Sequence, residues 1–320
     1  MKKYVIITLI LIFSVIWLSG CSFIEQSEEK TISIAEQYGL AYAPVTIMKE
    51  LNFLEEAGQD IKIEWKKLSN TAAIRESMLA GEVDVGFMAI PPFLIGSDKG
   101  MDWKMISGLS ESPLALMTNK EHIKSLEDLR SSDKIVLPQP GSIQHILLSM
   151  AAEREFGDAA RFDDQLVSMN HPDGMNALLS GREISAHFTS PPYIFMESQE
   201  TGIKSILTGE EAMGGEFTFI VGTAVEEFYS DPELSSLFIE ALNRSIAYIN
   251  NNPQQSAQIL AKYYDLSEDR VLEYISWEGM KYTSDIKGVD KFLSFMNNNG
   301  YISMEEYNLN QLIWDGRNDE

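Results

Sequence analysis

The sequence predicts an α/β protein with two similar lobes that face each other across a ligand cleft. The first observation is an internal repeat, in which residues 70–93 (NTAAIRESMLAGEVDVGFMAIPPF) return one hundred positions later as residues 170–193 (NHPDGMNALLSGREISAHFTSPPY). The second observation is that predicted strands alternate with predicted helices over most of the chain, which is typical of βαβ units. The third observation is that each copy ends its strand in a turn. Ligands of open α/β sheets bind beyond the carboxyl ends of strands, so two such turns predict a cleft between the lobes.

Each copy of the repeat has the same plan of helix, short strand and Pro-Pro turn. Asn70 or Asn170 is placed to cap the helix, and Gly81 or Gly181 is placed to end it. The apolar runs that follow agree only after a shift of one residue. Pro-Pro then ends the strand and begins another helix, since proline suits the first helical turn. The spacing is longer than a solenoid period, so it predicts two lobes rather than an array.

The other elements follow from periodicity and from turn residues. Residues 31–35 and 61–65 alternate apolar and polar side chains, as strands do. Ser125 to Asp128 has the pattern of a capping box, and a Pro- and Gly-rich turn separates a strand from a helix that opens at Ser142. We expect further strands at 103–109, 114–117, 134–137, 203–207 and 217–221, and helices that begin near Pro44, Pro253, Ser267, Gly288 and Ser303.

Composition excludes several functional classes. The chain of 320 residues has a formal net charge of -23, which argues against nucleic acid as a partner because phosphates require a basic surface. Its single cysteine excludes a disulfide within the chain. No close-spaced pair of metal ligands and no glycine-rich phosphate loop occurs, so we expect no metal and no cofactor.

The N-terminus has the pattern of a secretory signal. A basic start (MKK) and an uncharged apolar run precede the string LSGC, which ends at Cys21. This string resembles a bacterial lipobox, in which Cys21 would carry a lipid and become the first residue of the mature protein. The alternative is an uncleaved membrane anchor. We therefore expect a signal peptide at 1–20, an acidic tether at 21–30, and a protein body held outside the cytoplasm on a membrane.

Several short motifs in order resemble one protein family. The lipobox, a QYG loop, the segment LAGEVDVGF, the string SLEDL, a PGS turn and a second LLSG–PPY segment occur along the mature chain. Together they resemble the substrate-binding lipoproteins of ABC importers in the nitrate/sulfonate/taurine (NitT/TauT-like) and thiamine-precursor group. The resemblance implies a type II periplasmic-binding-protein-like fold that closes on its ligand. Lobe 1 would hold residues 31–115 and 220–320, and lobe 2 residues 116–219.

The resemblance also implies where the ligand binds. Ligand contacts of this family lie in loops whose matching positions here are Gln37, Tyr38, Tyr42, Ser69, Asn70, Thr71, Ala89, Ile90, Ser142, Ile143, Gln144, Asn170, His171, Thr189 and Ser190. The residue types agree with this role. Helix starts at Thr71, Ser142 and His171 would attract an anion or a polarised oxygen. Tyrosines in a glycine loop offer flat faces, whereas we expect Phe87, Phe188 and Trp277 to be core residues.

The sequence leaves the identity of the ligand open between two chemical classes. Aromatic loops favour a heterocyclic nitrogen compound such as a pyrimidine precursor, and helix starts without basic side chains also permit a sulfonate-like anion. The expected partners are this small molecule, an ABC permease and the membrane through Cys21, with the protein itself a monomer. One alternative is a ligand-sensing lipoprotein that signals to a membrane receptor. Another is an enzyme similar to pyrimidine-precursor synthases, whose cysteine-rich motif this chain lacks.

Overall fold

The computed structural model describes residues 30–57, 61–68, 70–304 and 309–316. The predicted signal peptide, Cys21 and nearly all of the tether therefore lie outside the described residues, and Lys30 is the first residue of strand β1. In the described part of the chain, no helix combines the length and the apolar character that a membrane span requires.

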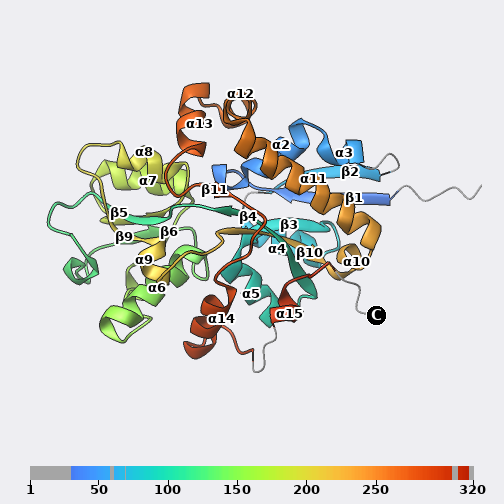
Figure 1. Ribbon diagram of the computed structural model, residues 1–320. Coiled ribbons are helices and arrows are strands. Elements are labelled where there is room, and N and C mark those ends of the chain that lie inside the picture. Colours follow the sequence, from blue (N-terminus) through green and yellow to red (C-terminus); the bar gives the residue numbers. More distant parts are fainter. Residues whose placement is uncertain (1–29, 58–60, 69, 305–308, 317–320) are drawn as a thin grey trace, which may run out of the picture. The chain divides into compact units, whose positions relative to one another are not determined.

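Within the described residues, eleven strands form two separate sheets (Figure 1). The first sheet has the order β11-β4-β10-β3-β1-β2, and the second has the order β7-β6-β8-β5-β9. The strands are β1 (Lys30–Glu36), β2 (Ile61–Lys67), β3 (Val85–Ala89), β4 (Trp103–Glu111), β5 (Ala115–Thr118), β6 (Ile135–Leu137), β7 (Leu166–Ser168), β8 (Ala186–Thr189), β9 (Lys204–Thr208), β10 (Ile220–Val225) and β11 (Lys281–Tyr282).

The two sheets share one strand order, which extends the internal repeat beyond the matching residues. Strand β3 lies between a parallel strand, β1, and an antiparallel strand, β10. Strand β8 lies in the same way between parallel β6 and antiparallel β5. The two strand orders therefore match strand by strand: β2-β1-β3-β10-β4 in the first sheet corresponds to β7-β6-β8-β5-β9 in the second. This arrangement confirms the predicted α/β class and the predicted repeat.

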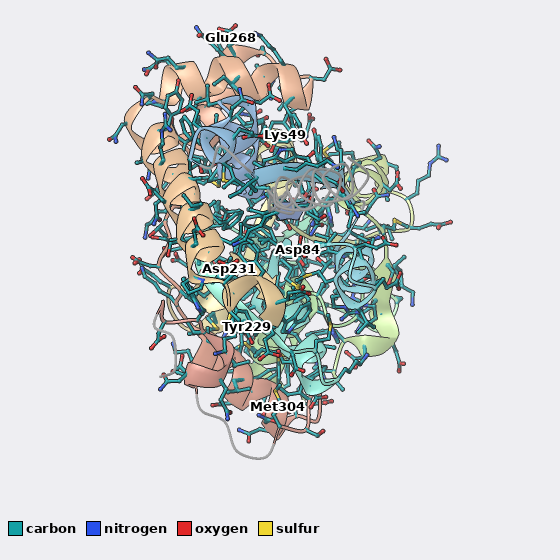
Figure 2. All side chains as sticks on the ribbon, turned by 90° about the vertical axis from the view of Figure 1, so that its right-hand side faces the viewer. Lys49, Asp84, Tyr229, Asp231, Glu268 and Met304 are labelled. Carbon is teal, nitrogen blue, oxygen red and sulfur yellow. The ribbon has the colours of Figure 1, made fainter. Side chains whose placement is uncertain are left out.

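Helices connect the strands and cover the sheets. The helices are α2 (Ala43–Glu50), α3 (Phe53–Ala57), α4 (Thr71–Leu79), α5 (Ile90–Asp98), α6 (Ile143–Phe156), α7 (His171–Ser180), α8 (Tyr193–Ser198), α9 (Gly209–Met213), α10 (Glu226–Tyr229), α11 (Pro232–Asn251), α12 (Pro253–Tyr264), α13 (Glu268–Ile275), α14 (Val289–Asn298) and α15 (Leu309–Leu312), with short 3-10 turns at Leu40–Tyr42, Leu126–Asp128 and Asp163–Gln165. The long helix α11 packs on α2 and α3 (Figure 1). Asp231 caps its start by accepting bonds from Glu233 N–H and Leu234 N–H, both at 3.1 Å (Figure 2).

The two copies of the repeat fold alike, as their cap residues predict. Asn70 Oδ1 accepts from Ala73 N–H at 3.0 Å, and Asn170 Oδ1 accepts from Asp173 N–H at 2.9 Å. Gly81 and Gly181 follow these helices with φ of 70° and 68°, in the region that favours glycine. The one-residue shift has a structural basis, because β3 has five residues and β8 has four.

Two predicted elements differ in the structure. A strand was expected at 217–221, but β10 begins at Ile220, because the backbone of Thr218 is bonded instead to Lys287 O at 3.1 Å. A helix was expected from Ser303, but the Ser303 N–H and hydroxyl both bond to Asp98 Oδ1, at 2.8 and 3.2 Å. These bonds anchor Ser303 to the end of α5, and the next described helix, α15, begins at Leu309.

The apolar core follows the same repeat. One large cluster of buried side chains includes Phe87 of β3 and Phe188 of β8, each with no exposed surface. The expectation that these two rings are core residues is confirmed. Trp277 is partly buried and stacks on Phe195 at 4.6 Å, so it too packs as expected. A small second cluster, which includes Val136 and Leu178, lies between the second sheet and α7.

Candidate functional site

A cavity of about 740 Å³ lies where loops from both sheets meet. The loops that line it follow β1, β2 and β3 in the first sheet and β6, β7 and β8 in the second, together with the start of β10. Its lining residues are Gln37, Tyr38, Gly39, Ala41, Tyr42, Asn70, Thr71, Ala89, Pro92, Pro138, Gln139, Ser142, Ile143, Gln144, Asn170, His171, Pro172, Ser190, Pro191, Tyr193, Phe219 and Ile220. The parallel strands β1, β3, β6, β7 and β8 therefore end toward one shared space.

The QYG loop after β1 is held in place by groups far away in sequence. Gln37 Nε2 donates to Thr71 Oγ1 at 3.3 Å and to Phe87 O at 3.1 Å, which ties the loop to the start of α4 and to strand β3. Gly39 has φ of 135°, a conformation that favours glycine. The C-terminal part of the chain completes the support, because Tyr264 Oη donates to Gly39 O at 2.9 Å.

Four helices begin at the cavity. Their first residues are Thr71 of α4, Ile90 of α5, Ile143 of α6 and His171 of α7. Side chains cap three of them, including Ser142 Oγ, which accepts from His145 N–H at 3.3 Å. The first amide groups of a helix have no partner within the helix, and its dipole places partial positive charge at this end. The cavity wall is therefore rich in hydrogen-bond donors.

Aromatic rings form the remaining walls. Tyr38 is 44% exposed and packs edge-on against Tyr264, with ring centroids 5.1 Å apart. Tyr193 stacks on His171 at 5.8 Å with 26° between the ring planes. Burial raises the pKa of the Tyr193 hydroxyl to about 12, so this ring remains neutral at physiological pH. A flat ligand could pack against such rings and gain about 0.5–1.5 kcal/mol per aromatic pair.

The cavity wall carries no formal charge. None of the described residues that line it is Lys, Arg, Asp or Glu. Burial and the neighbouring His187 lower the pKa of His171 to about 3, so this imidazole is neutral at pH 7. An ionic partner for a ligand charge is therefore absent from the described wall, and helix starts, hydroxyls and amides are what the cavity offers.

Behind the wall, a chain of hydrogen bonds runs from the cavity into the core. His171 Nε2 lies 3.1 Å from Ser190 Oγ and 3.3 Å from Gln144 Nε2. On the other side of the ring, His171 Nδ1 lies 3.1 Å from His187 Nε2. His187 Nδ1 in turn lies 2.6 Å from Glu197 Oε1, and both of these side chains are fully buried.

Gly174 makes room for this chain. A Cβ atom added at Gly174 of α7 would lie 2.7 Å from His187 Nε2 and 2.9 Å from Val136 Cγ1. Contacts this short do not occur for real side chains, so only glycine permits the His187 ring to lie against the helix. The sequence HPDG thus contains both the cavity-lining histidine and the glycine that accommodates its partner.

The structure brings most of the predicted site residues together. Those that line the cavity are Gln37, Tyr38, Tyr42, Asn70, Thr71, Ala89, Ser142, Ile143, Gln144, Asn170, His171 and Ser190. Ile90 and Thr189 do not line it, because both side chains are fully buried beside it. Ser69 lies outside the described residues. Contact with a ligand remains a prediction for every one of these positions.

Other wall residues were not among the predicted ligand contacts. They are Gly39, Ala41, Pro92, Pro138, Gln139, Pro172, Pro191, Tyr193, Phe219 and Ile220. Several of these residues lie inside motifs that the sequence had already shown, such as the QYG loop and the Pro-Pro turns. Membership of these motifs was a signal by which they could have been predicted to line the cavity. Phe219 and Ile220 are different, because they reach the cavity only through the pairing of Ile220 with Ala89 at the end of β3. No local sequence signal marks that pairing.

His145 of α6 has a structural role. His145 Nδ1 accepts from Gly141 N–H at 3.0 Å, and His145 Nε2 lies 3.1 Å from Asp163 Oδ1. The ring therefore fixes the turn before α6 rather than lining the cavity.

A second cavity, of about 640 Å³, lies along β5, β9 and α8. Charged side chains line it, including Glu111, Lys204 and Lys281. It lacks the contribution of matched loops from both repeats, so the larger cavity between the two sets of strand ends is the candidate site.

Comparisons with known proteins agree with this fold. A family model described as NMT1/THI5 like matches residues 41–256. No curated protein matches the chain in sequence. Among solved structures, the periplasmic aliphatic sulphonate binding protein SsuA from Escherichia coli is similar at 19% identity and a TM-score of 0.72, over 89% of this chain and 92% of that one.

Two further structures are similar to the same degree. The alkanesulfonate-binding protein SsuA from Xanthomonas axonopodis, bound to MOPS, has 16% identity and a TM-score of 0.69, over 85% of this chain and 92% of that one. The ligand-binding component of an ABC-type import system from Staphylococcus aureus has 16% identity and a TM-score of 0.71, over 89% and 96%. At these identities the likeness concerns the fold, and it confirms the predicted two-lobed periplasmic-binding-protein class.

Proposed function

The chain belongs to the NMT1/THI5-like family, and on that premise we propose that it is the substrate-binding protein of an ABC importer, acting outside the cytoplasm. The observation that carries the proposal is the cavity at which matched loops of the two repeats meet. The solved structures named above are two sulfonate-binding proteins and the ligand-binding component of an ABC-type import system. The function is therefore capture and delivery of a small molecule without its chemical conversion.

The ligand is a small organic solute that the cavity holds by stacking and by hydrogen bonds. Tyr38 and Tyr193 supply flat faces. The helix starts at Thr71, Ile143 and His171 supply donors, whereas Pro91 and Pro92 at the start of α5 have no N–H group. These features support a heterocyclic nitrogen compound such as a pyrimidine precursor. A sulfonate-like anion is the second candidate, supported by the helix starts and by the ligands named for two similar structures.

Capture works by closure of two lobes. Lobe 1 is assigned to residues 31–115 and 220–320 and lobe 2 to residues 116–219, which places the two sheets in different lobes. The connecting segments run between β4 and β5 and between α9 and β10. Hinge motion at such segments opens and closes a cleft around a ligand. The closed form would be the one that a permease recognises, with the binding protein itself a monomer.

A lipid on Cys21 would hold the protein at the outer face of the cytoplasmic membrane. The string LSGC after an apolar run supports this assignment. Cys21→Ala is expected to move the protein from the membrane fraction to the soluble extracytoplasmic fraction. Equal membrane retention of both forms would contradict a lipid anchor at this residue.

The direct test of function is native mass spectrometry of residues 22–320 purified gently from cells. A bound mass identifies the ligand class, and re-addition of that compound should raise the thermal stability as RT ln(1 + [L]/Kd), about 2.7 kcal/mol at a hundredfold excess over Kd. A thermal-shift panel of pyrimidines, flavins, sulfonates and nitrate follows for protein that is isolated empty. Turnover of a compound by the pure protein would contradict the proposal.

A further inference from the structure

The hydrogen-bonded chain Ser190–His171–His187–Glu197 connects the ligand cavity to a carboxyl group in the core. Its three links are 3.1, 3.1 and 2.6 Å long. A neutral imidazole carries one N–H and one acceptor nitrogen, so the direction of one link fixes the direction of the next. The protonation of Glu197 therefore decides what the far end of the chain offers to a ligand.

With both imidazoles neutral, two arrangements of protons satisfy all three links. With Glu197 protonated, its O–H donates to His187 Nδ1, His187 Nε2–H donates to His171 Nδ1, and His171 Nε2–H donates to Ser190 Oγ. The Ser190 hydroxyl proton then points into the cavity as a donor. With Glu197 ionised, one proton fewer is bound and every link runs the other way, so that Ser190 donates to His171 and presents only lone pairs to the cavity.

The surroundings of Glu197 favour the protonated arrangement. Its side chain has no exposed surface, and its Oε2 atom has no hydrogen-bond partner in the described part of the chain. A buried carboxylate is costly unless a cation or several donors compensate it. A proton on Oε1 faces His187 Nδ1 at 2.6 Å, whereas a proton on Oε2 would face no acceptor.

No described cation contacts this carboxyl group. The other titratable side chains on the neighbouring elements are Asp173 of α7, Tyr193 of α8, Lys204 of β9, and Glu268, Asp269, Arg270, Glu273 and Tyr274 of α13. Lys204 bonds to Glu121 O at 2.9 Å, and Arg270 bonds to Gln199 Oε1 at 2.8 Å. Their charges are thus engaged elsewhere.

One contact is oriented for the ionised arrangement. As placed, the Gln144 amide nitrogen faces His171 Nε2, whereas a ring N–H requires the amide oxygen there. A half-turn of the amide exchanges two groups of nearly equal size and brings the Gln144 oxygen against His171 Nε2. This half-turn costs far less than burying a carboxylate that accepts a single hydrogen bond and has no described cation beside it. It also turns the Gln144 NH₂ group toward the cavity, which adds another donor.

We infer that Glu197, acting through His187, sets the hydrogen-bonding polarity of the ligand cavity, and that its protonated state makes the wall at His171 and Ser190 a donor surface for an acceptor oxygen of the ligand. The inference rests on the proposed binding function for the identity of the cavity. It narrows the ligand class to compounds that place a carbonyl, carboxylate or sulfonate oxygen against Ser190. Glu197 and His187 are positioning residues, since neither lines the cavity.

The titration behaviour of the chain is consistent with this polarity. Burial raises the pKa of Glu197 to about 8 and lowers the pKa of His187 to about 3. At pH 7 the carboxyl group is therefore protonated and both rings are neutral. As the pH rises above about 8, Glu197 loses its proton, the chain reverses, and the cavity exchanges a donor for an acceptor.

The test is ¹⁵N NMR of the four histidines in the ligand-free protein, which reports the protonated nitrogen of each ring. At about pH 6.5, below the Glu197 pKa of about 8, His171 and His187 are expected as Nε2–H tautomers. On titration to about pH 9, both are expected to change to Nδ1–H. His145 is the internal control, because Gly141 N–H occupies its Nδ1 throughout. Nδ1–H tautomers at the lower pH, or a charged ring, would overturn the inference.

Two further measurements separate this inference from the proposed function. Glu197→Gln keeps a donor toward His187 at all pH values, so its Nε2–H tautomers should persist to about pH 9, well above the wild-type pKa of about 8. In thermal-shift assays, ethanesulfonate and benzoate should stabilise the protein more than their amine counterparts, ethylamine and benzylamine. Preference for the amines would overturn the inference and leave binding intact. Correct tautomers in a protein that captures no small molecule would overturn the binding function and leave the polarity standing.

Discussion

The hydroxyl group of Tyr264 in α12 donates a 2.9 Å hydrogen bond to the carbonyl oxygen of Gly39, 225 residues earlier in the chain. Tyr282 makes the same kind of bond to Leu40 O, also at 2.9 Å. Both tyrosines are buried, so these bonds exclude water from the back of the QYG loop. The C-terminal part of the chain thereby fixes the loop that carries Tyr38 and Tyr42 to the cavity.

Tyr264→Phe is expected to lower the free energy of unfolding by about 1 kcal/mol. The lost bond would cost up to about 3 kcal/mol if Gly39 O were left without a partner, but the Tyr42 N–H also donates to that oxygen at 3.0 Å. Urea unfolding measures the change. Tyr248→Phe is the matched control, since Tyr248 packs edge-on against Phe53 and should change stability by less. Equal effects of the two variants would contradict a specific role for the Tyr264 hydroxyl.

Gly174→Ala should destabilise the protein, although the same change stabilises most helices. Alanine at an interior helical position usually gains about 1 kcal/mol over glycine. Here the added Cβ would lie 2.7 Å from His187 Nε2 and 2.9 Å from Val136 Cγ1. We expect a loss of about 1–3 kcal/mol in unfolding experiments, as for other overpacked cores. Ala177→Gly in the same helix gives the ordinary propensity for comparison, and a stabilised Gly174→Ala protein would show that the ring moves freely.

Gly81→Ala and Gly181→Ala are expected to cost nearly the same. Both glycines end a repeat helix with positive φ, and neither has an atom within 4 Å of a built Cβ atom. Only backbone strain then opposes alanine, which amounts to about 1 kcal/mol. Asparagine tolerates this conformation better, so Gly81→Asn and Gly181→Asn should cost less than the alanine variants in thermal unfolding. A large difference between the two sites would mean that the copies differ in local structure.

The sequence predicted the parts of this molecule that local chemistry controls. Asn70 and Asn170 cap their helices as expected because a side chain three residues from a free N–H suffices to do so. The start of β10 was misplaced because Thr218 bonds to a segment some seventy residues away. The chain from His171 to Glu197 was missed for the same reason, since its links depend on how α7, β8 and α8 pack. Helix caps are local, whereas the wall of a cavity belongs to the tertiary fold.

Tyr193→Leu is expected to weaken ligand capture more than Tyr193→Phe. The Tyr193 ring stacks on His171 at 5.8 Å, and leucine removes this flat surface while it keeps much of the apolar volume. Loss of an aromatic pair corresponds to about 0.5–1.5 kcal/mol, or roughly a 2- to 12-fold rise in Kd. Titration calorimetry with the compound found by native mass spectrometry measures the ratio. Unchanged affinity in Tyr193→Leu would show that the Tyr193 ring lines the cavity without contacting the ligand.

The pH dependence of stability should have a maximum near pH 6.5 from the buried histidines and Glu197. The pKa values of His171 and His187 fall from 6.5 to about 3 on folding. Between these values the unfolded chain binds protons that the folded protein does not, so stability falls as the pH falls. The pKa of Glu197 rises from 4.5 to about 8. Between these values the folded protein holds a proton that the unfolded chain has released, so stability falls as the pH rises.

Glu197→Gln isolates the second effect, because the amide does not titrate. Relative to this variant, the wild-type protein should lose roughly 1 kcal/mol of unfolding free energy per pH unit as the pH rises from 4.5 toward 8. Urea unfolding at several pH values measures the difference, and Ser198→Ala in the same helix serves as a control without a titrating group. A constant difference between wild type and Glu197→Gln across this range would mean that Glu197 is ionised in the folded protein. The donor polarity assigned to Ser190 would then reverse as well, since both conclusions depend on the same proton.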